Sequence, residues 1–223
     1  PRMAATQQPL STARLACNER QAPEAPSGAF VVVATAVIVY STGRGHTLRL
    51  AQAVAEGMRS VPEVSPTLTD TAALSPQDWQ RMHDAEAIVF GCPTYMGGVA
   101  ASFKAFMDDS SDYWEERRWL DKIAAGFTIG TNYSGDKLMT LQHMAVFAAQ
   151  HGMIWVGQSI IGPRPVPGRE RQEDGDGSAL GLMATSSPDK TEMIYAADRR
   201  TAEIFGRRIG QAVLRWHDGS RQG

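Results

Sequence analysis

Residues 38–47 read Ile-Val-Tyr-Ser-Thr-Gly-Arg-Gly-His-Thr, a buried-strand pattern that ends in a turn rich in hydroxyl groups and glycine. An amphipathic pattern follows at once and predicts a helix over 47–59, so the turn lies at a helix N-terminus. Unpaired backbone N–H groups and the positive end of the helix dipole meet there and favour an anion. The lysine of a nucleoside-triphosphate loop is missing from this turn. The stretch therefore predicts a cradle for a phosphate monoester at the end of a strand.

The rest of the chain repeats this alternation of apolar runs and helical patterns, which is typical of βαβ units and a parallel sheet. Strands are expected at 31–40, 64–69, 87–91, 124–130 and 153–157, and helices at 47–59, 76–82, 100–109, 136–151 and 191–216. Ser75 is expected to cap the second helix, which begins with Pro76. We expect one α/β domain with a doubly wound, five-stranded parallel sheet in the order 2-1-3-4-5. In that order the loops after the first, third and fourth strands meet in one crevice.

Two further loops have the composition of ligand-binding segments. In the loop 91–98, Pro93 restricts the backbone and the next three residues can offer N–H groups to the oxygens and nitrogens of a flavin ring. An ordinary strand-to-helix turn would explain the same loop equally well. The loop 131–135 again offers small polar residues, and Asp136 after it is a candidate helix cap.

Composition narrows the class of protein. The chain has 223 residues, 43% of them hydrophobic, and a net charge of −2, which gives no reason to expect a nucleic-acid partner. Its longest apolar run, 29–40, is too short to span a bilayer. Cys17 and Cys92 provide no disulfide framework, so we expect reduced thiols and a cytoplasmic protein. No metal site is expected.

The domain boundaries follow from composition. Residues 1–29 lack a sustained period and predict a poorly ordered tail, and 219–223 form a second short tail. The folded domain is expected at 30–218. Within it, 158–188 is rich in glycine and proline with a charged centre, which predicts a long surface loop.

Four segments in chain order resemble one family, the flavodoxin-like NAD(P)H-dependent FMN oxidoreductases, related to the tryptophan-repressor-binding-protein type of NAD(P)H:quinone oxidoreductase. The segments are Tyr40–Thr47, Phe90–Gly97, Ser134–Leu141 and Gln150–Gly157. The resemblance covers about residues 30–216. It implies a flavodoxin-like fold, noncovalent FMN, NAD(P)H as electron donor, a quinone or similar acceptor, and a homodimer or homotetramer.

The resemblance also implies a set of site residues. Those expected to bind the cofactor are Ser41, Thr42, Gly43, Arg44, Gly45, His46, Thr47, Pro93, Thr94, Tyr95, Met96, Gly97, Thr131, Asn132, Ser134 and Gly135. His151 is the expected catalytic residue, at the pyrimidine edge of the flavin; the alternative is a charge partner for the end of its helix. Trp114 is expected in the wall of the substrate pocket, or else in an apolar cluster. Arg44 is expected at the phosphate of NADPH, or else in solvent.

Other functions remain open at this point. A flavodoxin-type single-electron carrier would use the same cradle, although a nearly neutral chain lacks the acidic surface suited to docking on a redox partner. A nicotinamide-binding Rossmann domain would need a third small residue where Leu48 stands. A phosphoacceptor domain would need acidic residues after the first strand, and none is present. A scaffold that has lost its cofactor would keep the fold and purify colourless.

Overall fold

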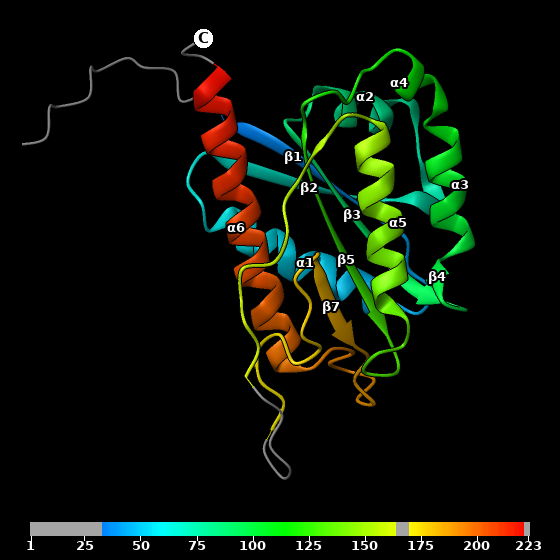
Figure 1. Cartoon of the computed structure of the whole chain (residues 1–223), viewed down its shortest axis with the longest axis vertical. Coiled ribbons are helices and arrows are strands. Elements are labelled where there is room, and N and C mark those ends of the chain that lie inside the picture. The colour runs from blue at the N-terminus through cyan, green and yellow to red at the C-terminus, as the bar shows by residue number, and fades with distance from the viewer. Residues whose placement is uncertain (1–32, 164–169, 221–223) are drawn as a thin grey trace, which may run out of the picture. The chain divides into compact units, whose positions relative to one another are not determined.

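A computed structural model describes residues 33–163 and 170–220. The expectations for the tail at 1–29, for Cys17 and for the end of the chain after 220 lie outside the described residues. The structure has a central sheet with helices on both faces (Figure 1). This is the flavodoxin-like α/β fold that the alternating pattern predicts.

The sheet has the strand order β2-β1-β3-β5-β6, which confirms the predicted order once the short strand β4 is counted. The strands are β1 (Ala34–Tyr40), β2 (Val64–Asp70), β3 (Ala87–Tyr95), β4 (Gly98–Val99), β5 (Ile123–Gly130), β6 (Ile154–Trp155) and β7 (Leu182–Thr185). All the pairings along this path are parallel. β4 folds back antiparallel on the end of β3.

The edge position beside β5 is shared by two short strands. β6 pairs with Ile123 and Ala124 at the start of β5, and β7 pairs with its last four residues, 127–130. The chain between them forms the long excursion expected from composition. The sequence did not predict β7, because a four-residue apolar run surrounded by glycine and proline does not distinguish a strand from a loop.

Helices cover the two faces of the sheet. They are α1 (His46–Arg59), α2 (Pro76–Asp84), α3 (Ala101–Asp109), α4 (Ser111–Glu115), α5 (Lys137–Gln150) and α6 (Ala196–Ser220), with a 3-10 turn η1 (Thr71–Ala73). In Figure 1, α1 and α6 lie on one side of the sheet, and α3 and α5 lie on the other. α2 begins as predicted, with Ser75 and Asp78 forming a reciprocal capping box and Pro76 in the first turn.

Successive residues of a strand point to opposite faces of the sheet, and each face has its own hydrophobic core. Ile38 of β1 packs in the core beneath α1 and α6, whereas its neighbour Val39 packs in an aromatic core with Phe90 and Phe103 on the other face. α1 and α6 approach each other closely because glycine stands at the crossing. A Cβ atom at Gly206 would lie 2.0 Å from the backbone oxygen of Val54. This contact fixes the position of α1, whose N-terminus faces the crevice described next.

Candidate functional site

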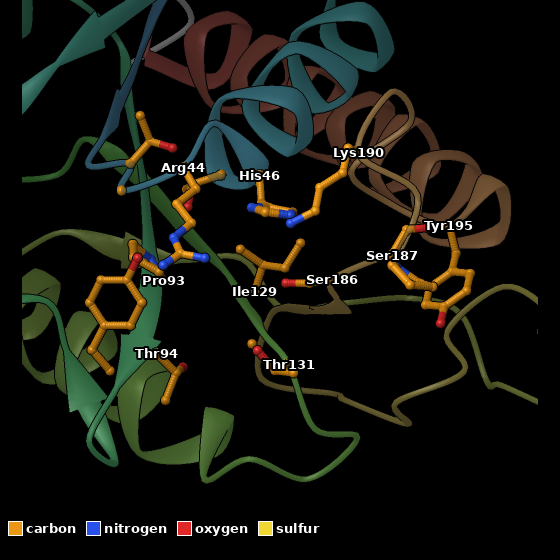
Figure 2. Close-up of a pocket in the computed structure, with 16 residues that line it drawn as sticks. Arg44, His46, Pro93, Thr94, Ile129, Thr131, Ser186, Ser187, Lys190 and Tyr195 are labelled. Atoms are coloured by element: carbon orange, nitrogen blue, oxygen red, sulfur yellow. The ribbon is translucent and has the colours of Figure 1, made fainter.

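A cavity of about 700 Å³ opens at the carboxyl ends of the strands, where the chain after β1, β3 and β5 converges. Its size is within the range of small-molecule sites, roughly 300–1,000 Å³. It is lined by Thr42, Gly43, Arg44, His46, Thr47, Pro93, Thr94, Tyr95, Ile129, Gly130, Thr131, Ser186, Ser187, Pro188, Lys190 and Tyr195. Figure 2 shows side chains from these segments pointing into one space. The structure thus brings together the three loops singled out by composition, and a fourth segment joins them.

The turn at 41–47 forms one end of the cavity. Gly45, the residue before α1, has a φ of 92° and gives the helix no side-chain cap, so backbone N–H groups of the first turn face the cavity. The Thr42 hydroxyl accepts a hydrogen bond from the Gly45 N–H at 3.1 Å and shapes the turn. Thr47 is 1% exposed and lines the cavity. These groups suit an anion, as the sequence predicts.

Ser41 has a different role from the one expected. Its hydroxyl lies 2.6 Å from the Ser102 hydroxyl, and its side chain is 4% exposed and outside the cavity lining. Its backbone N–H donates to the Gly91 carbonyl at 2.9 Å and continues the sheet between β1 and β3. Ser41 therefore joins two of the loops, and its predicted side-chain contact with the phosphate is not supported.

The charge of the cavity is positive. Within the part of the chain that the structure describes, no aspartate or glutamate lines it, whereas Arg44 and Lys190 do. Figure 2 shows Arg44 and Lys190 approaching the space from two different segments, with His46 beside Lys190. Burial lowers the pKa of His46, and the positive charges of Lys190 and Arg44 lower it further. Two permanent cations at a helix N-terminus favour a dianionic ligand over a neutral one.

The chain after β3 forms one wall. Pro93, Thr94 and Tyr95 line the cavity, but Met96 projects outward, fully exposed. The Thr94 hydroxyl lies 2.9 Å from the Thr128 hydroxyl and 2.7 Å from the Thr140 hydroxyl, so these two neighbours already engage it. Tyr95 packs over the phosphate turn, since a Cβ atom at Gly43 would lie 2.2 Å from its hydroxyl oxygen. A larger residue at 43 would have to displace the end of the Tyr95 side chain, which is 51% exposed.

The third loop contributes less than expected. Thr131 and the preceding Gly130 line the cavity, whereas Asn132, Ser134 and Gly135 do not. Gly97, in the second loop, is likewise outside the lining. Asp136 adopts a left-handed conformation with φ 55° and makes no side-chain cap with α5, so the expectation that it caps this helix is wrong.

The segment between β7 and α6 was missed. It supplies Ser186, Ser187, Pro188, Lys190 and Tyr195, and it is fixed to the third loop by a hydrogen bond from the Ser186 N–H to the Gly130 carbonyl at 2.8 Å. For this reason α6 begins at Ala196, five residues later than predicted. The sequence did carry a signal: the apolar run 182–185 is followed by Ser-Ser-Pro, the same strand-to-polar-turn pattern as at 38–43.

The predicted catalytic residue His151 lies elsewhere. It follows the last residue of α5, while the crevice is at the first, and a helix of 14 residues is about 21 Å long. Its ring packs 4.4 Å from Trp119 and 4.8 Å from Phe147, centroid to centroid. His151 therefore does not line this chain's own cavity, and its role at the pyrimidine edge of the flavin stays a prediction. Trp114, 53% exposed, shares a separate hollow of about 480 Å³ with His151 and does not line the cavity either.

His151 is also not a charged partner for its helix end. Its Nε2 lies 3.1 Å from the Ser110 hydroxyl, which itself donates to the Met107 carbonyl at 2.7 Å. The ring nitrogen must then donate to Ser110, which leaves Nδ1 deprotonated and, among the described residues, without a partner. Burial lowers the pKa of His151 to about 4, so the ring is neutral near pH 7.

Three further observations concern the thiol, metal ligands and the helices of the described residues. Cys92 is fully buried, and burial raises its pKa to about 12, so it packs as a thiol. No group of three or more metal-ligating side chains occurs within 33–163 and 170–220. In the same ranges, none of the helices is both long and apolar enough to cross a membrane.

Comparisons with known proteins agree with this geometry. Residues 33–163 match the model of the family described as NADPH-dependent FMN reductase. Flavodoxin FldP of Pseudomonas aeruginosa is 35% identical over 82% of this chain and 98% of its own length. An NAD(P)H dehydrogenase (quinone) of Archaeoglobus fulgidus is 28% identical over 81% of this chain and 98% of its own. The crystal structure of a WrbA-like flavodoxin from Agrobacterium tumefaciens superposes with a TM-score of 0.65 at 35% identity, covering 82% of this chain and 98% of that one.

Proposed function

The chain belongs to the NADPH-dependent FMN reductase family, and from this premise we propose that it transfers two electrons from NAD(P)H, through bound FMN, to a quinone or a similar small acceptor. FMN is the cofactor and NAD(P)H the donor that the family implies. The observation that carries the proposal is the cavity itself. It joins a helix N-terminus, two cations and a ring-sized wall in about 700 Å³, and no acidic side chain of the described residues enters it.

The residues present fit FMN. A phosphate dianion at the N-terminus of α1 would meet the Thr47 hydroxyl, the backbone of the 42–45 turn, and the charges of Arg44 and Lys190. Pro93, Thr94 and Tyr95, together with Ile129 and Thr131, line the same cavity and would hold the rest of the molecule. When bound, FMN supplies hydride acceptance and electron transfer.

In the proposed reaction, the protein itself binds the cofactor and the donor and orients them. His46 is the one histidine among the described residues that line the cavity, and burial together with the charges of Lys190 and Arg44 lowers its pKa, which disfavours its charged form. Arg44 and Lys190 would neutralise the charge of a phosphate group. Their positive charge would also attract NAD(P)H, which is an anion, to the cavity. Reduction of a quinone to a hydroquinone takes up one proton in addition to the hydride. Because no carboxylate lines the described cavity, this proton would come from solvent water.

A second candidate is a single-electron carrier, and one observation favours it: a relative of 35% identity is named a flavodoxin. A carrier receives electrons from a partner protein and docks through complementary charge. The net charge of −2 offers little for such docking. We therefore rank the enzyme first.

The test is direct reduction by a nicotinamide donor. Purified protein, reconstituted with FMN and freed of excess by gel filtration, is mixed without oxygen with NADPH or NADH while the visible flavin absorbance is followed. The enzyme loses its absorbance at a rate that saturates with donor and regains it when a quinone is added. A protein that retains FMN yet is reduced by neither donor is a carrier, and a protein that retains no FMN refutes both functions.

The assembly and location follow from the same proposal. We propose a homodimer or homotetramer, supported by the resemblance and by exposed apolar side chains on the outer face of α5 and α4, Leu138, Met139, Val146 and Trp114. Sedimentation of the FMN-loaded protein tests this. A cytoplasmic location is proposed because NAD(P)H is a cytoplasmic donor; fractionation of cells that express the chain checks it.

A further inference from the structure

Three charged side chains of the long excursion between β6 and β7, those of Arg171, Asp174 and Asp176, are largely buried. Asp176 has a fully buried side chain, the Arg171 side chain is 11% exposed, and Asp174 is 4% exposed. Charged residues are rarely buried unless they are paired. The loop expected from composition therefore reaches the surface at Gln172, Gly175 and Gly177 but buries these three charged side chains.

Four buried charged side chains, two positive and two negative, form one network of ion pairs: Lys137, Arg171, Asp176 and Asp198. Asp176 forms an ion pair with Lys137, the first residue of α5, and a second ion pair with Arg171, whose nearest nitrogen lies 2.8 Å from the carboxylate. Arg171 donates from Nε to Asp198 of α6 at 2.8 Å. Two cations and two anions thus neutralise each other with side-chain exposures of 0–11%. The network joins α5, the excursion and α6, three elements far apart in the sequence.

The same network holds the end of β7. Lys137 donates to the Ala184 carbonyl at 2.8 Å and to the Thr185 hydroxyl at 3.0 Å. The Thr185 N–H donates to Asp198 at 2.9 Å. Thr185 is the last residue before the segment 186–195, which lines the cavity. The starting point of that segment is therefore set by the buried charges.

Arg171 also contacts two aromatic side chains on the far side of the network. Its guanidinium carbon lies 5.4 Å from the ring centroid of Tyr133 and 5.5 Å from that of Tyr195. Tyr195 lines the cavity, and Tyr133 belongs to the loop whose Thr131 lines it. Both separations are within cation–π range, about 6 Å. One side chain of the excursion thus bridges two walls of the site.

We propose that Arg171 is a positioning residue for the cofactor cavity: through Tyr133 and Tyr195 it holds the loop 131–135 and the segment 186–195 in the arrangement that binds FMN. The inference rests on the proposed function for its ligand and on the geometry of the network for the bridge. Arg171 itself does not line the cavity. Its effect must therefore pass through the side chains that it contacts, which include Tyr133, Tyr195 and Asp198.

The first measurement needs no ligand. Hydrogen–deuterium exchange of the apoprotein is compared between the wild type and Arg171→Met. We expect faster exchange in both 131–136 and 186–195, with β1 unchanged. Arg200→Met is the matched control, because Arg200 forms an exposed ion pair with Glu173 of the same excursion. Exchange in both walls that is equal to the wild type overturns the proposal.

The second measurement is the Kd for FMN, from quenching of flavin fluorescence. Arg171→Met is expected to raise it about tenfold, since Arg171 makes two cation–π contacts and each contact at a solvent-accessible ring corresponds to roughly two- to fivefold in affinity. Tyr133, 67% exposed, gives a variant that should fold normally. Tyr133→Leu should raise the Kd in the same way and Tyr133→Phe, which keeps the ring, should stay within twofold of the wild type.

A double variant separates bridging from direct contact. If Tyr133 acts through Arg171, the combined change of Arg171→Met with Tyr133→Leu should not exceed the larger single effect. Additive losses, or an unchanged Kd in Arg171→Met, overturn the proposal. A wild type that binds no FMN refutes the proposed function instead, and the exchange experiment still decides whether the bridge exists.

Discussion

Replacing His151 by glutamine should change how the stability of the protein depends on pH. The His151 ring lies between Trp119 and Phe147, and its Nε2–H donates to Ser110. Adding a proton would place a charge on Nδ1, which is buried without a partner among the described residues. Burial therefore lowers the pKa to about 4 from its ordinary 6.5. Glutamine retains a donor for Ser110 but cannot be protonated in this range.

The sign and size follow from linkage. Between the two pKa values the unfolded chain binds a proton at His151 and the folded chain does not, so the free energy of unfolding falls as the pH is lowered from 6.5 toward 4. Each pKa unit corresponds to about 1.4 kcal/mol, which gives about 3 kcal/mol for a fully desolvated ring. Two hollows that His151 lines admit solvent close to the ring. Because this solvent screens the charge, we expect the free energy of unfolding to fall by about 2 kcal/mol.

The assay is denaturant unfolding of the apoprotein at a series of pH values from about neutral down to pH 4. The wild type should lose about 2 kcal/mol more than His151→Gln over this interval, and the carboxylates that titrate there cancel in the difference. His143→Gln is the matched control, since His143 is an exposed histidine on the same helix; it should follow the wild type. A pH dependence identical in wild type and His151→Gln would refute the reasoning.

Four further changes address the cavity and the fold. Thr47→Val should weaken FMN binding about ten- to a hundredfold and riboflavin binding little, and equal losses would exclude a phosphate contact. Lys190→Ala should weaken FMN binding and flatten its dependence on salt in a titration series. Arg44→Ala should raise the Michaelis constant for NADPH more than for NADH. An unchanged ratio of the two constants would show that Arg44 does not contact the extra phosphate of NADPH. Gly206→Ala, which sets a methyl 2.0 Å from the Val54 oxygen, should destabilise by about 3 kcal/mol in thermal unfolding.

The sequence predicted the parts of the fold that depend on local pattern. The order of the strands and the convergence of the loops after β1, β3 and β5 follow from apolar periodicity and from the geometry of parallel sheets, and the structure agrees. The turn at 41–47 was recognisable because glycine and hydroxyl residues follow a strand and precede a helix.

What the sequence did not predict depends on contacts between distant residues. Asp176 and Arg171 lie in a charged stretch typical of solvent-exposed loops, and only their partners Lys137 and Asp198, on two other elements, make burial possible. β7 forms because its four residues pair with residues 127–130 at the end of β5. The hydrophobic pattern of residues 182–185 alone does not indicate this pairing. His151 could have been placed correctly. The predicted helix from 136 to 151 was long enough to carry it away from the crevice.

The division of the outer strand position between β6 and β7 has a consequence for solubility. A long, flat strand at the margin of a sheet presents unpaired backbone groups on which another chain can add a strand and start an aggregate. Here that margin consists of one strand of two residues and one of four, separated by the excursion, so neither offers a continuous template. At the opposite margin, β2 carries Pro66, which lacks a donor for a further neighbour. Both sides of the sheet thus discourage the strand-by-strand growth to which an open parallel sheet is exposed.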